Sequence, residues 1–203
     1  MAGAIWLGSM SLSHEQSEEM KRIRRVSDML STSHAMLRDR FARRALILDL
    51  LTLAFSTCVV ALAFVAPNIA ERLTPFHWDS TLWLGILSVL TFFATLVQLK
   101  TDWKSKSDAH RRTLDLYAEV KREAVYLLAA DREDEHSYTR VLARYDMASA
   151  VGIEVPEKDF LALKRQHKLK VTLSKHLDEY PSTSLRLFRV KLWFRDNGFR
   201  RRQ

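Results

Sequence analysis

The chain contains two long apolar stretches, ALILDLLTLAFSTCVVALAFVA at Ala45–Ala66 and TLWLGILSVLTFFATLVQL at Thr81–Leu99. The first contains one charged residue, Asp49, and the second contains none. A helix needs about 20 apolar residues to cross a hydrocarbon core of roughly 30 Å. The stretches therefore predict an all-α integral membrane protein with a two-helix transmembrane hairpin. The alternative is a soluble bundle with two buried helices, and it must explain why neither stretch has a charged outer face.

The orientation of this hairpin follows from the basic residues beside it. The loop at 67–80 contains one basic residue, Arg72, whereas both flanks of the hairpin are rich in them. The basic residues expected at the membrane interface are Arg43, Arg44, Lys100 and Lys104. Because such residues stay on the cytoplasmic side, we expect a multi-pass protein of the inner (cytoplasmic) membrane with both termini in the cytoplasm.

Three further regions surround the hairpin, which occupies residues 45–99 with an external loop at 67–80. Residues 1–44 predict an N-terminal cytoplasmic helix that begins at about Ser13, where Ser13 and Gln16 resemble a capping box. Residues 100–180 predict a cytoplasmic helical region, and residues 181–203 a basic amphipathic tail. No Gly or Pro separates either apolar stretch from the helix beside it, so each pair can be continuous.

The two flanking helices carry apolar stripes with roughly 3.5-residue spacing. The first stripe consists of Ile23, Val26 or Ser27, Leu30, Leu37 and Phe41, and it is interrupted by Ser33 and His34. The second consists of Trp103, His110, Leu114, Tyr117, Val120 or Lys121, Ala124, and Leu127 or Leu128. The simplest architecture packs one stripe against the other, so that the hairpin extends into an antiparallel cytoplasmic stalk.

The C-terminal part predicts two more helices and a tail. A helix at about 134–150 should bury one apolar face, made of Tyr138, Val141, Leu142, Tyr145 and Ala148. A helix at roughly 156–178, with Pro156 in its first position, should bury another, made of Phe160, Leu161, Leu163, Leu169, Leu173 and Leu177. The tail mixes apolar and basic residues. As a helix it can lie on an anionic membrane surface, or it can pack against the stalk or a partner protein. Its residues 185–192 also alternate like a strand, and binding of nucleic acid is not favoured.

Small and polar residues of the second apolar stretch fall within roughly a 140° arc of a helix. They are Thr81, Gly85, Ser88, Thr91, Thr95 and Gln98. In lipid-embedded helices such residues mark helix–helix contacts or, where water enters, a pore wall. Both interpretations stay open. Because two helices cannot enclose a pore, a pore requires a homo-oligomer, and these six residues are the candidates for its lining.

Asp49 is the one intramembrane charge of the predicted hairpin, about one turn inside the cytoplasmic boundary. At the bilayer centre a carboxylate costs about 2.5–3.5 kcal/mol, and near the boundary it costs less. Asp49 can reach Arg43 or Arg44 through the interface, or Lys100 across the hairpin. An interfacial ion pair is one interpretation, and a role in gating or selectivity is the other.

Sequence patterns of catalysis are missing. The five glycines are scattered, the seven histidines have no metal-ligand spacing, and neither HExxH nor GxSxG occurs. Cys58 is the only cysteine, which excludes an intrachain disulfide. We therefore expect no enzyme, no metal site and no cofactor. The net charge of +8 suggests anionic lipid or a phosphate-bearing ligand, although topology alone can account for it.

The layout of a helix, a hairpin with a short turn, and a long helix directly after it resembles the SLATT family. These are bacterial two-transmembrane effectors associated with nucleotide second-messenger immune systems. The stretch DAHRRTLDLYAEVKREAVYLL at Asp108–Leu128 is similar to their post-hairpin helix, where a small residue, a His and a Tyr recur. The resemblance covers roughly residues 13–130. It implies an oligomeric pore-forming or membrane-disrupting effector of anti-phage (abortive infection) defence, triggered by a nucleotide second messenger or a separate sensor protein.

The second hypothesis belongs to a different class of function. In this alternative the protein is a non-conducting anchor or scaffold in the lipid bilayer, and its cytoplasmic helices recruit a partner. A metal-ion channel is less favoured, because the loop at 67–80 offers only Glu71 and Asp79 as acidic residues.

Overall fold

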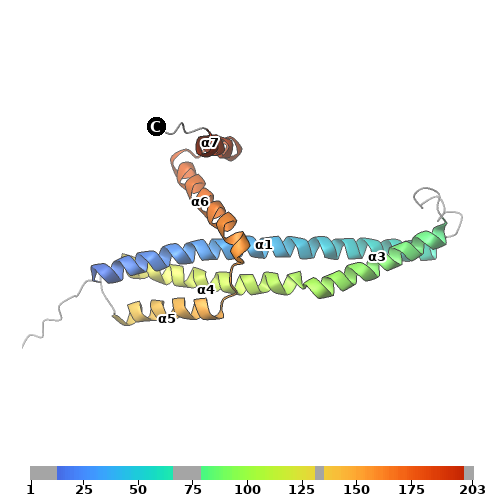
Figure 1. Ribbon diagram of the computed structural model, residues 1–203, viewed down its shortest axis with the longest axis horizontal. Helices are drawn as coiled ribbons and strands as arrows, with labels where there is room; N and C mark the ends of the chain where they lie inside the picture. Colours follow the sequence, from blue (N-terminus) through green and yellow to red (C-terminus); the bar gives the residue numbers. More distant parts are fainter. Residues whose placement is uncertain (1–12, 66–78, 131–134, 199–203) are drawn as a thin grey trace, which may run out of the picture. The chain divides into compact units, whose positions relative to one another are not determined.

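The computed structural model describes residues 13–65, 79–130 and 135–198, and all regular secondary structure within these ranges is helical. The helices are α1 (His14–Phe64), α3 (Ser80–Thr101), α4 (Trp103–Ala129), α5 (Glu135–Val151), α6 (Glu157–Glu179) and α7 (Leu185–Asn197). The all-α prediction is thus confirmed for this part of the chain (Figure 1). The predicted external loop lies, up to residue 78, outside the described residues, as do residues 1–12 of the N-terminal region and 199–203 of the tail.

Two compact units make up the chain: residues 1–153, with α1, α3, α4 and α5, and residues 154–203, with α6 and α7. This division groups α6 with the tail helix, whereas the sequence predicts α6 in the same cytoplasmic region as α4 and α5.

Helix α1 is a single unbroken helix of 51 residues, about 75 Å long at 1.5 Å per residue. It begins with the predicted capping box: the Gln16 N–H donates to Ser13 Oγ at 3.2 Å, and the Ser13 N–H donates to Gln16 Oε1 at 3.0 Å. These two bonds satisfy backbone donors that lack a partner at a helix start. The continuity of the N-terminal helix with the first apolar stretch is confirmed.

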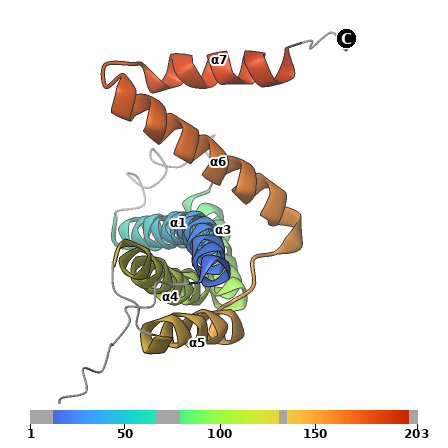
Figure 2. The same cartoon turned by 90° about the vertical axis from the view of Figure 1, so that its left-hand side faces the viewer.

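The polar half of α1 packs along α4, and we call this pair, residues 14–44 with α4, the stalk (Figure 2). Its contact follows a seven-residue repeat of coiled-coil type. On α1 the repeat runs through Met20, Ser27, His34 and Phe41, and on α4 through Trp103, His110, Tyr117 and Ala124. The packing of one predicted stripe against the other is therefore observed. Ser33 and His34, the polar residues that interrupt the first stripe, are both buried.

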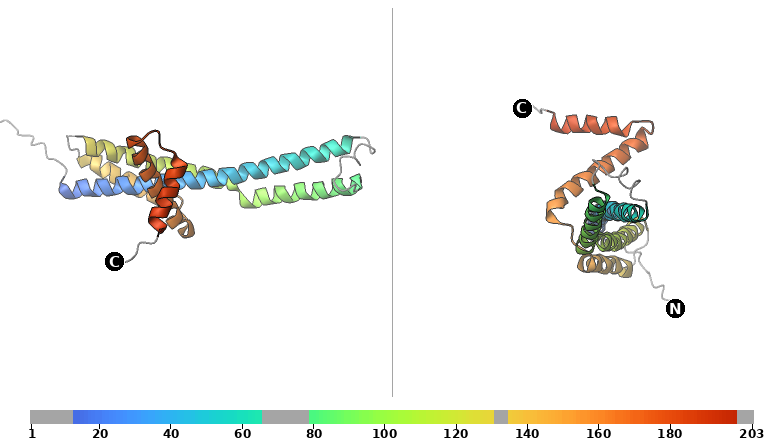
Figure 3. Two further views of the ribbon diagram at one scale, coloured as in Figure 1. Left: turned by 90° about the horizontal axis from the view of Figure 1, so that it is seen from above. Right: turned by 90° about the vertical axis from the view of Figure 1, so that its right-hand side faces the viewer.

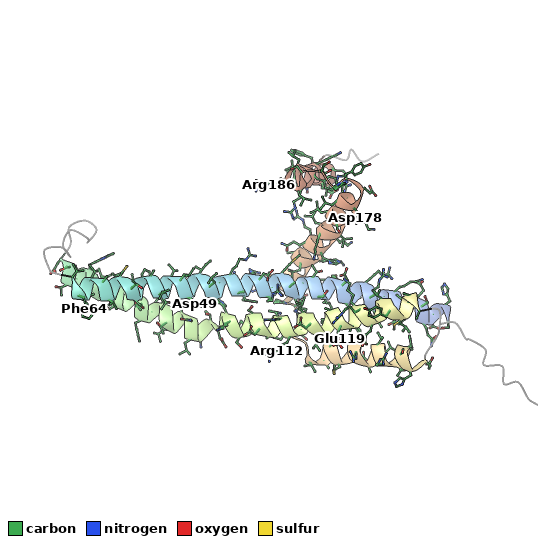
Figure 4. All side chains as sticks on the ribbon, turned by 180° about the vertical axis from the view of Figure 1, so that it is seen from behind. Asp49, Phe64, Arg112, Glu119, Asp178 and Arg186 are labelled. Atoms are coloured by element: carbon green, nitrogen blue, oxygen red, sulfur yellow. The ribbon has the colours of Figure 1, made fainter. Side chains whose placement is uncertain are left out.

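Helix α5 lies against α4 and completes the core of this unit. Val141 and Ala148 are buried, and Tyr138, Leu142 and Tyr145 are partly buried against the same cluster, as the sequence predicts. Polar contacts add to this packing, because Arg144 of α5 forms ion pairs with Glu119 and Glu123 of α4. Figure 4 labels Glu119 on α4 beside α5.

The turn after α5 depends on a glycine. A Cβ at Gly152 would lie 2.5 Å from the Ala148 carbonyl oxygen and 2.9 Å from Thr113 Cγ2, so a larger residue does not fit without displacement. The Ile153 N–H donates to Thr113 Oγ1 at 3.1 Å, which ties this turn to α4.

The apolar half of α1 runs beside α3, and we call residues 45–64 with α3 the apolar hairpin (Figure 3, left). Leu87 and Ala94 of α3 are buried, but most of the large apolar side chains of the apolar hairpin are exposed. No residue is buried in the most apolar segment of α1. In the most apolar segment of α3 and α4, 11% of the residues are buried. Both helices are long and apolar enough to cross a membrane, and within the described part of the chain no protein core covers them.

A single residue separates α3 from α4. Asp102 has φ 42° and ψ 50°, the left-handed conformation, which Asp adopts more readily than most residues. Its N–H donates to the Gln98 carbonyl at 3.1 Å and its carboxylate accepts from the Ser105 N–H at 3.3 Å. Asp102 therefore ends one helix and caps the next without Gly or Pro, so the second apolar stretch is not continuous with the helix after it, although the sequence allows continuity.

The C-terminal unit consists of α6 and α7. Leu163, Leu173 and Leu192 are buried, whereas Leu161, expected on the buried face, is 74% exposed. Pro156 is the N-cap of α6 rather than its first helical residue. The rings of His176 and Phe188 stack at 3.8 Å and join the two helices. The tail is helical over Leu185–Asn197, which resolves the ambiguity between helix and strand.

Candidate functional site

The apolar hairpin meets the stalk at a cavity of about 480 Å³. Several of the predicted site residues line it: Asp49, Thr95, Gln98 and Lys104, together with Asp102 and Trp103. Figure 4 shows Asp49 at the level of the break between α3 and α4. The structure thus gathers at one place the charged residue of the first apolar stretch, one end of the polar stripe of α3 and the break between the two helices.

Asp49 is held by an amide rather than by a basic residue. Gln98 Nε2 donates to Asp49 Oδ1 at 2.7 Å, so the bond joins α3 to α1. The ion pairs considered from sequence, with Arg43, Arg44 or Lys100, are not among the contacts of Asp49. For Arg43 and Arg44 the physical reason is helical geometry: they lie six and five positions before Asp49, and residues so spaced point to different sides of a helix.

The predicted interface residues have other contacts. Arg43 Nε donates to the Asp39 carbonyl at 3.2 Å, and the Arg44 guanidinium lies 5.9 Å from the centre of the Trp103 ring. A guanidinium over an indole face is a cation–π contact, and this one joins α1 to the start of α4. Lys100 is exposed in the last turn of α3.

The polar stripe of α3 lies mostly outside the contact with α1. Thr81, Gly85, Ser88 and Thr95 are exposed, Thr91 is half-buried, and nothing lies within 4 Å of a Cβ built at Gly85. The hydroxyls of Ser88, Thr91 and Thr95 donate to the carbonyls four residues earlier at 2.8, 2.8 and 2.9 Å. Packing within one chain therefore does not account for the stripe, and each hydroxyl proton is already satisfied within its own helix.

A second cluster, which sequence reasoning missed, is the pair of buried histidines in the stalk. His34 Nδ1 of α1 lies 3.0 Å from His110 Nδ1 of α4, and the two side chains are 1% and 4% exposed. Tyr117 stacks on the His34 ring at 5.9 Å, and Phe41 stacks on the His110 ring at 5.5 Å. The four rings form a column that alternates between the two helices, and we call it the ring column.

The hydrogen bond between the histidines restricts their protonation. One ring must carry its hydrogen on Nδ1 and donate it, while the other accepts with its Nδ1 lone pair. Burial, with a smaller contribution from the charge of His110, lowers the pKa of His34 to about 4, and burial also lowers the pKa of His110. Both rings are therefore neutral at pH 7, and adding a proton to either is unfavourable in the folded stalk.

The two helices of the stalk also bury several hydroxyls. Ser107 Oγ donates to the Arg38 carbonyl at 3.2 Å, and Thr113 Oγ1 to the Ala109 carbonyl at 3.1 Å. Ser27 is fully buried, and its hydroxyl has no hydrogen-bond partner among the described residues. Among these residues no group of three or more His, Cys, Asp or Glu could hold a metal ion.

One sequence signal could have revealed the histidine pair. His34 precedes Ala45 by eleven residues, and His110 follows Leu99 by eleven residues. In an antiparallel hairpin, positions equally far from the two apolar stretches lie opposite each other. Treating each histidine as an isolated polar residue overlooked this symmetry.

Comparison of the chain with models of protein families, with curated protein sequences and with solved structures found no match. The resemblance to the SLATT family therefore rests on the layout and residues quoted in the sequence analysis.

Proposed function

We propose that this protein is a two-span membrane protein that assembles into a homo-oligomer and permeabilises the lipid bilayer through a pore lined by α3. The observation that carries the proposal is the polar stripe of α3, most of which is exposed outside the contact with α1 on an otherwise apolar helix. In a bilayer such a stripe is stabilised by small-residue contacts with further copies of the chain or by water in a channel.

Both termini and the stalk lie in the cytoplasm in this proposal, with the basic residues at 38–44 and 100–112 on that side. Residues 45–64 span about 30 Å as a helix, which equals the hydrocarbon thickness. The Asp49–Gln98 pair then lies near the cytoplasmic end of the hairpin, where a carboxylate costs less than at the centre.

The biological role that we propose is that of an effector in bacterial anti-phage defence, which damages the membrane of the infected cell. Its support is the resemblance in layout and in the Asp108–Leu128 stretch. The trigger would be a nucleotide second messenger or a separate sensor protein that acts on the described helices outside the apolar hairpin.

The test is ion flux from liposomes that contain the full-length protein. Ser88→Leu and Thr95→Leu add bulk on the proposed pore face, and we expect each to lower the flux by about tenfold or more, since a filled constriction excludes water and ions. The matched control is Phe92→Leu, at an exposed apolar position of the same helix. Equal flux from all three variants and the unaltered protein would contradict a pore on this face.

One observation favours the alternative, a non-conducting anchor whose helices recruit a cytoplasmic partner. The hydroxyls of Ser88, Thr91 and Thr95 are satisfied within α3, so this face can meet lipid without a water-filled channel. The anchor predicts no flux in liposomes and unchanged function when α3 and residues 45–64 are replaced by unrelated membrane spans.

A further inference from the structure

The positive charge of the protein is concentrated in its C-terminal unit. Residues 154–203 contain 13 Lys and Arg against 6 Asp and Glu, a net charge of +7 out of +8 for the whole chain. The remaining residues, which include both flanks of the apolar hairpin, are almost balanced. Membrane topology alone therefore does not explain where the excess charge lies, because the topology rule concerns residues close to the spans.

Within this unit, α6 and α7 diverge from the turn that joins them (Figure 2). Residues of both helices line a groove of about 750 Å³. Its basic residues come from both helices: Lys164, Arg165 and Lys168 from α6, and Arg189 and Arg195 from α7. Lys164 and Lys168 are four residues apart, so they share one face of α6. We call this feature the basic groove.

The charge in the basic groove is largely uncompensated. Its one acidic residue, Asp196, is already paired with Arg195 at 2.9 Å. Arg165, Lys168 and Arg189 form no ion pair with a carboxylate in the part of the chain that the structure describes. Several like charges held around one concave surface raise the local concentration of anions.

The groove also contains apolar and aromatic surface. Leu169 and the buried Leu192 contribute aliphatic surface, and Trp193 of α7 contributes an indole ring that is 53% exposed. Phe194 packs edge-on against this indole, with ring centres 5.0 Å apart. A partly exposed indole can stack on the flat ring of a ligand, while the guanidinium groups bind phosphate oxygens in pairs.

We propose that the basic groove binds a phosphate-bearing ligand with an attached ring or acyl group, rather than phosphate alone. The volume lies in the range of small-molecule sites, about 300–1,000 Å³, and is far larger than one phosphate ion needs. Two sources share this chemistry: a free nucleotide, whose ring can stack on Trp193, and the headgroup of an anionic phospholipid. The site goes beyond the proposed pore, and its test measures binding alone, so either proposal can fail without the other.

The experiment is isothermal titration of the full-length protein in neutral detergent micelles at about 0.15 M salt, where distant surface charges are screened. The probes are ATP without divalent metal, inorganic phosphate, and short-chain dioctanoyl phosphatidylglycerol. The groove variant is Lys164→Gln with Lys168→Gln. The matched control is Lys170→Gln with Lys175→Gln, which removes two exposed charges of α6 outside the groove. Circular dichroism checks that both variants keep their helix content.

We expect ATP or the phospholipid to bind, and the groove variant to weaken that binding by about tenfold or more because charge-assisted hydrogen bonds are lost. The control variant should change it by less than about twofold. Trp193→Leu identifies the source: weaker ATP binding with unchanged phospholipid binding indicates a nucleotide, and binding of phospholipid alone indicates a headgroup. Binding of neither probe, of inorganic phosphate as tightly as ATP, or equal losses in the groove and control variants would overturn the proposal.

Discussion

Acid should destabilise the stalk through the His34–His110 pair. The pKa of His34 is about 4 in the folded protein and about 6.5 in an unfolded chain. Above pH 6.5 neither state binds the proton, so stability does not depend on pH through this group. Between pH 6.5 and 4 the unfolded state binds the proton and the folded state does not, so stability falls as the pH falls.

The size of the effect follows from the pKa difference. The full difference of about 2.5 units corresponds to roughly 3 kcal/mol, of which about 2 kcal/mol should be lost between pH 7 and pH 5. His110, whose pKa is also lowered by burial, contributes in the same direction. At low pH two protonated rings would also place two Nδ1–H groups against each other across the 3.0 Å contact.

The assay is thermal unfolding of the full-length protein in neutral detergent, followed by circular dichroism, at pH 7, 6 and 5. The double variant His34→Leu with His110→Leu keeps bulky apolar side chains at two repeat positions of the stalk and removes the titrating groups. We expect it to lose most of the pH dependence and to exceed the unaltered protein in stability at pH 5. The matched control, His14→Gln, changes an exposed histidine at the start of α1 and should keep the full dependence. If the double variant unfolds with the same pH dependence as the unaltered protein, the assignment of this effect to the ring column is wrong.

Three further predictions concern the turn after α5, the hairpin and the break between α3 and α4. Gly152→Ala should lower the free energy of unfolding by about 1–3 kcal/mol in denaturant titrations, because the alanine Cβ would lie 2.9 Å from Thr113 Cγ2. An unchanged free energy of unfolding would show that the turn after α5 moves to accept the methyl group. A double-mutant cycle of Asp49→Leu and Gln98→Leu should give a coupling of about 0.5–1.5 kcal/mol, measured by thermal unfolding in micelles, and additive effects would mean that the 2.7 Å bond contributes nothing. Asp102→Val should lower the free energy of unfolding of the protein by about 1–2 kcal/mol relative to Asp102→Gly, because a φ of 42° is strained for a β-branched residue. Equal melting temperatures of the two variants would argue against the left-handed conformation at this junction.

Local patterns in the sequence were enough to predict the helices and the pairing of the stalk. The capping box at Ser13, the inward face of α5 and the opposed stripes of α1 and α4 depend on residues close together in the chain, whose spacing sets the helix face they occupy. The two long apolar helices were predicted from the length and composition of their apolar stretches. Helix periodicity also placed the six polar residues of α3 on one arc, whichever partner covers them.

Only the tertiary structure decided the partner of Asp49, the pairing of the two histidines, the lining of the basic groove and the break at Asp102. Asp49 is bound by Gln98 rather than by an arginine, since the rotation of α1 against α3 selects its partner. Asp102 ends α3 although neither Gly nor Pro is present, because its own carboxylate caps the next helix and its backbone tolerates a positive φ. The histidine pair and the basic groove each join residues of two helices, and the relative rotation of two helices comes from packing that no single stretch of sequence encodes.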